Sequence, residues 1–425
     1  TVHSSHATPH SPPSRSDAVF HVLLTMAAMI VTGRLVSWLL RRIEQPPVVG
    51  EVVAGILLGP SLLGLLAPRA SSFLLPPSVA PYLAVVAQLG VILYMFLVGL
   101  ELNFDSLRQR ARAAVAISHA SIVVPFLLGA GLAIALYPRL STGDVRFTSF
   151  ALFLGVAMAI TAFPVLARIL TDRGMTKSDL GVMALSCAAI DDVTAWCLLA
   201  LVIGVAQAHV DGAMWVAAGT LAYIAIMFLV VRPVVDRLIH RCEATGLTRG
   251  TTAAVFVAVL LSAVATEWIG IHAIFGAFLL GAVMPHDSRV ARELTHKLED
   301  PVTILLLPAF FAYTGMRTQI SLVTGVESWL ICALIIAVAT LGKFGGTFAA
   351  ARLTGLGGRD AAALGTLMNT RGLMELVVLN IGLDMGVISP TLFAMMVLMA
   401  LATTMATAPV LSWLMRGKER LAVPG

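Results

Sequence analysis

Long apolar segments alternate with short polar connections along almost the whole chain. Thirteen segments are apolar enough to be membrane-crossing helices, at residues 18–40, 47–66, 79–102, 111–137, 148–170, 178–206, 212–236, 250–266, 270–284, 301–316, 327–352, 360–384 and 390–415. A helix needs about 20 apolar residues to cross the hydrocarbon core of a bilayer, and most of these segments reach that length. The pattern predicts an all-α polytopic membrane protein.

Composition supports this prediction and excludes other classes of protein. Of 425 residues, 58% are hydrophobic and 12% are charged, against roughly 25% charged in an average soluble domain. The formal net charge is +5, but Lys and Arg are concentrated in short connections, as in membrane proteins, so we expect a lipid bilayer and no nucleic acid as partner. The chain has no Walker-type nucleotide-binding motif, which argues against an ATP-driven pump.

The distribution of Lys and Arg predicts the orientation of the chain. Most basic residues of the connections lie on one side, and the other side carries only Arg15, Arg69, Arg139, Arg146 and Arg317. The positive-inside rule then places the N-terminus outside and the C-terminus in the cytoplasm, and a bacterial inner membrane is the expected location. We expect residues 1–17 to be a disordered extracytoplasmic tail, 18–415 to be one membrane domain, and 416–425 to be a short cytoplasmic tail without a soluble regulatory domain.

Charged residues lie near the centres of three predicted spans. They are Asp191 and Asp192 in the sixth, Lys343 in the eleventh, and Arg371 and Glu375 in the twelfth. A charge in the middle of a bilayer costs several kcal/mol unless it is paired or lines a wet cavity, so such residues are functional candidates. The alternative is a buried ion-pair network that only holds helices together.

The adjacent pair Asp191-Asp192 is the best candidate for an ion site. Neighbouring residues on a helix point about 100° apart, so one carboxylate can line a cavity while the other faces a partner such as Lys343. Carboxylate and carbonyl oxygens suit a dehydrated Na⁺ or K⁺, and a buried carboxyl group can instead hold a proton. An aspartyl protease needs two carboxylates that share a proton, which divergent neighbours cannot do, so we predict no enzyme.

Two spans contain sequences that break a helix. The fifth has Thr161 and Ala162 shortly before Pro164, and the twelfth has Asn369 and Thr370 shortly before a glycine. Irregular backbone at membrane depth is tolerated only beside protein or water. Spans five and twelve correspond if the chain is an inverted repeat of six spans, one linking span and six spans, an arrangement common in secondary transporters. Glu51, near the start of the second span, is either an interfacial anchor or part of an access funnel.

Four segments together resemble the cation:proton antiporter-2 family, in its Kef/CHX-like branch. These are 47–60 (PVVGEVVAGILLGP), 96–101 (FLVGLE), 161–168 (TAFPVLAR) and 369–376 (NTRGLMEL). They occur in order within residues 18–415. The resemblance implies a sodium/proton antiporter fold of about 13 helices, with two broken helices that cross near the ion site.

The resemblance also implies roles for single residues and for the assembly. Asp192 would bind the cation or the proton, Asp191 would pair with Lys343, and Arg371 and Glu375 would form a second pair in the core. The core would comprise elements near 79–206 and 301–384 and would move like an elevator against dimerisation elements in the remainder. A homodimer without cofactors that exchanges K⁺ or Na⁺ for H⁺ is therefore expected.

One departure from the family pattern leaves the transported ion open. Kef-type members have Gln-Asp and many CHX-type members have Asn-Asp where this chain has Asp191-Asp192. An Asp-Asp pair with a core Lys is shared with electrogenic Na⁺/H⁺ members, so neither the ion nor the stoichiometry follows from the sequence. Alternative functions are a Kef-type, glutathione-gated-like K⁺ efflux channel or transporter, although a carbonyl filter sequence is absent, and an antiporter-fold exporter of a specialised cargo.

Overall fold

The computed structural model describes residues 15–101, 111–143, 145–176, 178–207, 210–242 and 247–415. Both predicted tails lie almost entirely outside this part of the chain, since residues 1–14 and 416–425 are not described. Residues 15–17 form the first turn of the first helix. The predicted tail of residues 1–17 is therefore corrected at its C-terminal end.

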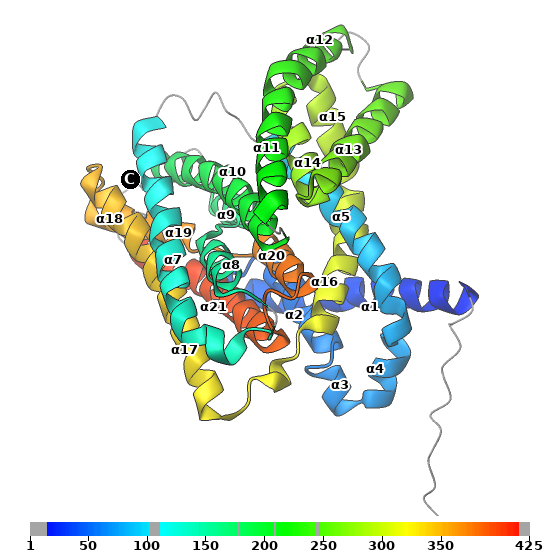
Figure 1. The fold of residues 1–425 in the computed structure, drawn as a ribbon, viewed down its shortest axis with the longest axis vertical. Helices are drawn as coiled ribbons and strands as arrows, with labels where there is room; N and C mark the ends of the chain where they lie inside the picture. The colour runs from blue at the N-terminus through cyan, green and yellow to red at the C-terminus, as the bar shows by residue number, and fades with distance from the viewer. Residues whose placement is uncertain are drawn as a thin grey trace, which may run out of the picture.

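The described residues fold into helices without any strand (Figure 1). In chain order these are α1 (Arg15–Leu40), α2 (Pro47–Leu58), α3 (Leu63–Leu66), α4 (Pro68–Leu74), α5 (Ala80–Glu101), α7 (Ala111–Leu140), α8 (Phe147–Ala159), α9 (Phe163–Asp172), α10 (Asp179–Gln207), α11 (Val210–Ile226), α12 (Arg232–Cys242), α13 (Arg249–Ile269), α14 (Ala273–Val283), α15 (Arg289–Asp300), α16 (Leu307–Arg317), α17 (Gly325–Thr340), α18 (Gly346–Leu353), α19 (Gly358–Met368), α20 (Leu373–Asp384) and α21 (Pro390–Met415). π-Helical turns at 227–231, 301–306 and 341–345 join α11 to α12, α15 to α16 and α17 to α18.

Within the described residues, every predicted span is mainly helical. Within the described ranges, 10 helices are long and apolar enough to cross a membrane. The other three predicted spans, at 270–284, 301–316 and 360–384, are also helical but are short, distorted or broken. The span at 360–384 is interrupted between Met368 and Leu373, and the charged residues Arg371 and Glu375 lie at or beside this interruption.

The helices pack as two groups (Figure 1). The crossing group contains α7–α10 and α17–α21, and the frame group contains α1, α2, α5, α11–α14 and α16. This grouping differs from the predicted core of 79–206 and 301–384. Helices α5 and α16 pack in the frame group against α14 and α2, whereas α21 packs in the crossing group against α17 and α19.

Glycine contacts explain why α5 and α16 belong to the frame group. A Cβ atom at Gly99 of α5 would lie 2.2 Å from the carbonyl oxygen of Phe278 in α14, and one at Gly315 of α16 would lie 2.1 Å from that of Gly55 in α2. Small residues allow membrane helices to approach closely, and van der Waals packing then stabilises the contact.

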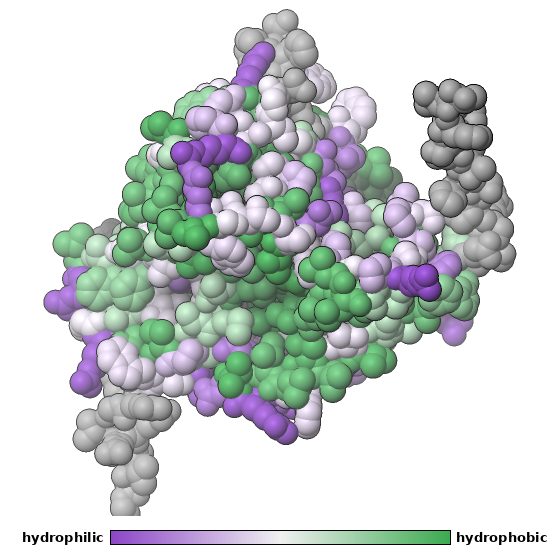
Figure 2. Space-filling view, turned by 90° about the horizontal axis from the view of Figure 1, so that it is seen from below, coloured by the Kyte–Doolittle hydropathy of each residue, from purple (hydrophilic) through white to green (hydrophobic). Residues whose placement is uncertain are grey.

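The outer surface of the helices is largely apolar. Large side chains such as Val31, Leu229, Leu261 and Trp268 are more than 60% exposed. Figure 2 shows continuous apolar areas (green) on one face, with hydrophilic residues gathered in separate patches. Because lipid replaces water around a membrane protein, this distribution fits a chain that is embedded in a bilayer.

The close contact at Gly315 predicts a strong effect of one methyl group. Gly315→Ala should reduce the free energy of unfolding by about 1–3 kcal/mol, because the new Cβ atom overlaps the backbone of Gly55. The measurement is thermal unfolding in detergent, with Gly131→Ala in α7 as control, since no atom outside the local backbone of α7 lies within 4 Å of a Cβ atom there. An equal Tm for Gly315→Ala and the control would contradict the close contact between Gly315 and Gly55.

Candidate ion-binding site

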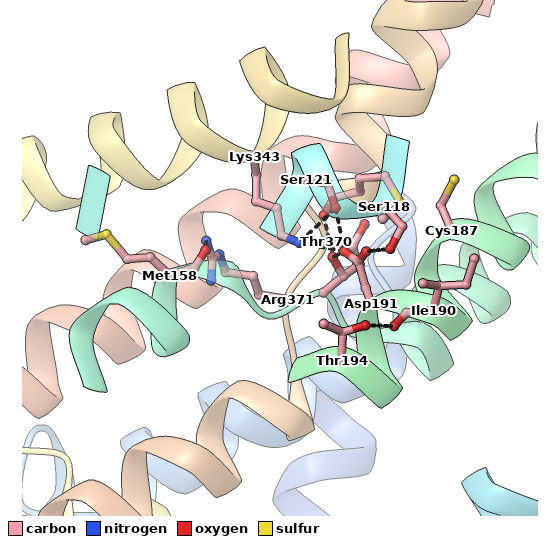
Figure 3. Close-up of polar contacts among 12 residues, drawn as sticks. Ser118, Ser121, Met158, Cys187, Ile190, Asp191, Thr194, Lys343, Thr370 and Arg371 are labelled. Carbon is pink, nitrogen blue, oxygen red and sulfur yellow. Dashed lines mark hydrogen bonds and ion pairs between the residues drawn. The ribbon is translucent and has the colours of Figure 1, made fainter. Parts of the chain in front are cut away.

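Asp191 on α10 lies at the centre of a buried polar cluster (Figure 3). Its side chain is fully buried, as is that of Lys343, whose Nζ lies 2.8 Å from Asp191 Oδ2. Three hydroxyl groups also donate hydrogen bonds to this carboxylate, from Ser118 (2.5 Å), Ser121 (2.6 Å) and Thr161 (2.9 Å). A buried charge is tolerated when it is paired and hydrogen-bonded in this way.

Asp192 has an entirely different environment although it is the next residue. It is 1% exposed, and neither of its carboxylate oxygens has a hydrogen-bond partner among the described residues. The backbone N–H of Phe163, the first residue of α9, is directed toward this carboxylate but does not meet the geometry of a hydrogen bond. A buried carboxylate without a partner is costly, and a proton or a cation would remove that cost.

The two broken spans meet beside these carboxylates. Helix α8 ends at Ala159 and α9 begins at Phe163, while α19 ends at Met368 and α20 begins at Leu373. The backbone N–H of Ala162 donates to the carbonyl of Thr370 (2.9 Å), and the Thr161 hydroxyl, whose one hydrogen is shared between Asp191 and Met368, lies 3.1 Å from the Met368 carbonyl oxygen. Four half-helix ends therefore converge on one place, where their dipoles act on any bound ion.

The positions of Pro164 and Asn369 fit this crossing. Pro164 lies in the first turn of α9, where its missing N–H has no partner to lose. Asn369 follows the last residue of α19, and its buried side-chain oxygen has no hydrogen-bond partner within the described part of the chain. The Asn369 side-chain oxygen is therefore available to a ligand at the crossing, in addition to the Asp192 carboxylate.

Arg371 and Glu375 form the second buried pair, with Nη1 and Oε2 separated by 2.7 Å and no exposed surface on either side chain. The Arg371 guanidinium also donates to the carbonyls of Ala157 (3.0 Å) and Met158 (2.7 Å), at the C-terminal end of α8 (Figure 3). A positive charge is favourable at a helix C-terminus, so Arg371 stabilises the end of α8 that the break creates.

Sequence reasoning missed three residues of this region. Ser118 and Ser121 bind Asp191, and the Thr404 hydroxyl of α21 both accepts from the Arg371 backbone N–H (2.9 Å) and donates to its carbonyl (2.7 Å). The two serines are three residues apart on α7 and share a helix face. Their spacing on α7, at the same depth in the membrane as Asp191, could have indicated that both serines bind this carboxylate.

A cavity of about 360 Å³ reaches the crossing from one side. Ala162, Pro164 and Leu373 line its inner end. Its charged lining residues are Arg34, Arg41, Glu51, Arg168, Glu299 and Asp300. Glu51 thus lies in a passage between the frame group and the crossing group, on the side of the predicted cytoplasmic connections.

The donor set suits a hard monovalent cation. Carboxylate, hydroxyl and carbonyl oxygens surround the crossing, and these are the ligands that alkali cations prefer. No cluster of three or more His, Cys, Asp or Glu residues that could hold a metal ion occurs in the described ranges.

An all-helical membrane protein with two broken, crossing helices beside buried carboxylates has the architecture of an antiporter-type secondary transporter. The fold is similar to the solved structure of the sodium proton antiporter MjNhaP1 from Methanocaldococcus jannaschii at pH 8, with a TM-score of 0.68 at 14% identity, over 95% of this chain and 99% of that chain. Residues 27–417 match the family described as sodium/hydrogen exchanger, transmembrane. The chain belongs to this family of multi-pass membrane proteins, so the predicted fold and family are confirmed.

Relatives at higher identity carry related names. The chain is 45% identical to the Na(+)/H(+) antiporter NhaS4 of Synechocystis over 91% of this chain and 95% of that protein. It is 39% identical to Cation/H(+) antiporter 18 of Arabidopsis thaliana over 91% of this chain, and 34% identical to K(+)/H(+) antiporter 1 of Saccharomyces cerevisiae over 86%. The chain spans only 48% and 43% of these two proteins. All three are named as transporters, consistent with a protein that is not an enzyme.

The buried pair predicts an unequal response to single and double substitution. Asp191→Asn should reduce the free energy of unfolding by about 3–5 kcal/mol, because it leaves the Lys343 ammonium buried without a counter-charge. Asp191→Asn with Lys343→Gln should recover much of this loss. Thermal unfolding in detergent measures both.

The matched control for this prediction is Asp172→Asn, which removes one partner of an exposed ion pair with Arg168. An exposed pair contributes about 0–1 kcal/mol, so this variant should unfold close to wild type. A double variant at positions 191 and 343 that is less stable than Asp191→Asn would show that the two charges do not compensate each other.

Proposed function

We propose that the protein is a secondary active transporter that exchanges a monovalent cation, Na⁺ or K⁺, for protons. The supporting observation is the buried Asp192 carboxylate, which has no hydrogen-bond partner among the described residues and lies at the crossing of the two broken helices. The names of relatives that match most of this chain also support exchange of a monovalent cation for H⁺.

Competition at one carboxylate would couple the two fluxes. Asp192 binds either a proton or a cation, because each removes the cost of its buried charge and only one is needed. Thr161, Asn369 and Thr370 supply further oxygens from the crossing. Asp191 is held by Lys343 and three hydroxyl groups, so it supports the site while Asp192 exchanges its ligand.

Access to the site would alternate by movement of the crossing group against the frame group. The cavity of about 360 Å³ lies between these groups and ends at Ala162, Pro164 and Leu373. In the orientation predicted from loop charge, with the N-terminus outside, this state is open to the cytoplasm. We further propose that the frame groups of two copies form a homodimer, which would fix them in a bacterial inner membrane while the crossing groups move.

Proton flux in proteoliposomes tests this function. A pH-sensitive dye inside the vesicles should report proton movement when Na⁺, K⁺, Li⁺ and Rb⁺ gradients are applied in turn. Exchange with one or more of these ions supports the proposal and identifies the cation. Ion conductance at channel rates without coupled proton movement would contradict it.

Asp192→Asn should abolish cation-driven proton flux, because an amide cannot exchange a proton for a cation. The variant should elute and unfold like wild type or be slightly more stable, since the lost charge has no hydrogen-bond partner within the described residues. Glu327→Gln, at an exposed carboxylate on α17, is the control and should retain flux. Near wild-type flux in Asp192→Asn would exclude the proposed role.

The protonation state of Lys343 would determine the stoichiometry of exchange. If cation binding at Asp192 breaks the Asp191–Lys343 pair, the buried ammonium can avoid its desolvation cost by releasing its proton. Two protons would then leave for each monovalent cation, and transport would move net charge. We expect a transport current on a solid-supported membrane for wild type and a reduced current for Lys343→Gln.

Exchange without a transport current would contradict this prediction. If dye measurements show proton/cation exchange by wild type but no current accompanies it, exchange is one for one. Lys343 would then serve only as a structural counter-ion for Asp191.

A further inference from the structure

The two helix groups are joined by charged and polar side chains on the side of the crossing opposite the large cavity. Arg317, the last residue of α16, contacts Asp384, the last residue of α20, with 2.6 Å between Nη2 and Oδ1. Arg317 Nη1 also donates to Asn380 Oδ1 (3.2 Å), and Asn380 Nδ2 donates to Thr314 Oγ1 (2.9 Å). We call these four residues the clasp, since α16 belongs to the frame group and α20 to the crossing group.

Arg317 is held in place by its own helix. Its guanidinium lies 5.1 Å from the centre of the Tyr313 ring and donates to the Tyr313 hydroxyl (3.1 Å). The side chain is 20% exposed, against 56% for Asp384. An isolated exposed ion pair contributes little, but a pre-positioned arginine that also bonds the buried Asn380 loses less freedom when it pairs.

Helix dipoles favour the same pairing. Asp384 lies at the C-terminal end of α20, where a negative charge is unfavourable unless a cation is close. Arg317 lies at the C-terminal end of α16, where a positive charge is favourable. Separating the two helices would therefore leave Asp384 in a worse environment, so the clasp resists that movement.

The clasp is connected to the ion site through one rigid helix. Helix α20 has 12 residues, and its first residue, Leu373, directly follows the break at the crossing. At 1.5 Å per residue the helix is about 18 Å long, so a displacement at Asp384 is transmitted to the crossing. Beneath the clasp lies a cavity of only about 80 Å³, between Val91 and Tyr313 of the frame group and Val377 and Asn380 of the crossing group.

We infer that Arg317 is a positioning residue for exchange: by holding Asp384 and Asn380 of α20 against α16, it keeps the ion site closed on the side opposite the large cavity. This inference rests on the proposed alternating access. Release of the clasp is then the step that allows the crossing group to move and the small cavity to widen.

A labelling experiment tests the clasp without measuring transport. The four cysteines of the chain are replaced by alanine, and Val91→Cys is introduced as a reporter, because Val91 is 2% exposed and lines the small cavity. A membrane-impermeant methanethiosulfonate reagent is applied to membrane vesicles of both orientations. Labelling from the side of Arg317 should be slow in this background.

Loss of the clasp should accelerate labelling from that side. We expect Arg317→Gln to raise the rate roughly five- to tenfold, because it loses one ion pair and one hydrogen bond, and Asp384→Asn, which loses only the ion pair, to raise it about two- to fivefold. Arg317→Lys keeps the charge but not the planar guanidinium that contacts Asp384 and Asn380 together, so it should label at a rate between those of wild type and Arg317→Gln. Arg139→Gln is the matched control, because Arg139 forms an ion pair with Glu327 within the crossing group on the same side, and it should change nothing.

Each outcome decides the inference. Unchanged labelling in both Arg317→Gln and Asp384→Asn, or equal acceleration by Arg139→Gln, would overturn it. If Arg317→Gln does not fold, Asp384→Asn and Arg317→Lys still provide the comparison. Failure of the proposed function is seen separately, because dye-reported flux can be absent while labelling still responds to the clasp.

Discussion

The arrangement of this protein depends on the cost of placing charge inside a membrane. Lys343 and Arg371 are fully buried, and each lies next to a carboxylate at 2.7–2.8 Å. Removal of either carboxylate would leave a cation in a medium that solvates it poorly. The fold around the site brings these partners together from α10, the turn between α17 and α18, the break between α19 and α20, and the first turn of α20.

The same cost explains why the two helix breaks must meet. A break exposes backbone N–H and carbonyl groups that lipid cannot satisfy. Here the Ala162 N–H is satisfied by the Thr370 carbonyl, and the end of α8 is satisfied by the Arg371 guanidinium. Each break thus supplies what the other lacks, and neither would be stable alone. Arg371 therefore stabilises the broken end of α8 as well as balancing the charge of Glu375.

Most of this architecture could be predicted from sequence, because hydropathy, loop charge and buried charge are local signals. The segments, the charged positions and both breaks follow from them. The assignment of α5, α16 and α21 to helix groups could not be predicted from sequence. It depends on contacts between residues that are distant in sequence, such as Gly315 and Gly55. Ser118, Ser121 and Thr404 were missed because hydroxyl residues are common in membrane helices, where they often bond to their own backbone.

The difference between the adjacent residues Asp191 and Asp192 has a consequence for coupling under the proposed function. The pairs Asp191–Lys343 and Arg371–Glu375 are each neutral, so Asp192 carries the one unbalanced charge of the buried cluster. If Lys343 keeps its proton, a bound proton or a bound monovalent cation neutralises Asp192 equally, whereas release of the Lys343 proton would leave one negative charge in the cation-loaded cluster. The empty, charged site is the state that pays the largest desolvation cost when the crossing group moves past apolar surroundings. Movement is therefore favoured only with one ligand or the other, and this preference is what exchange without leakage requires.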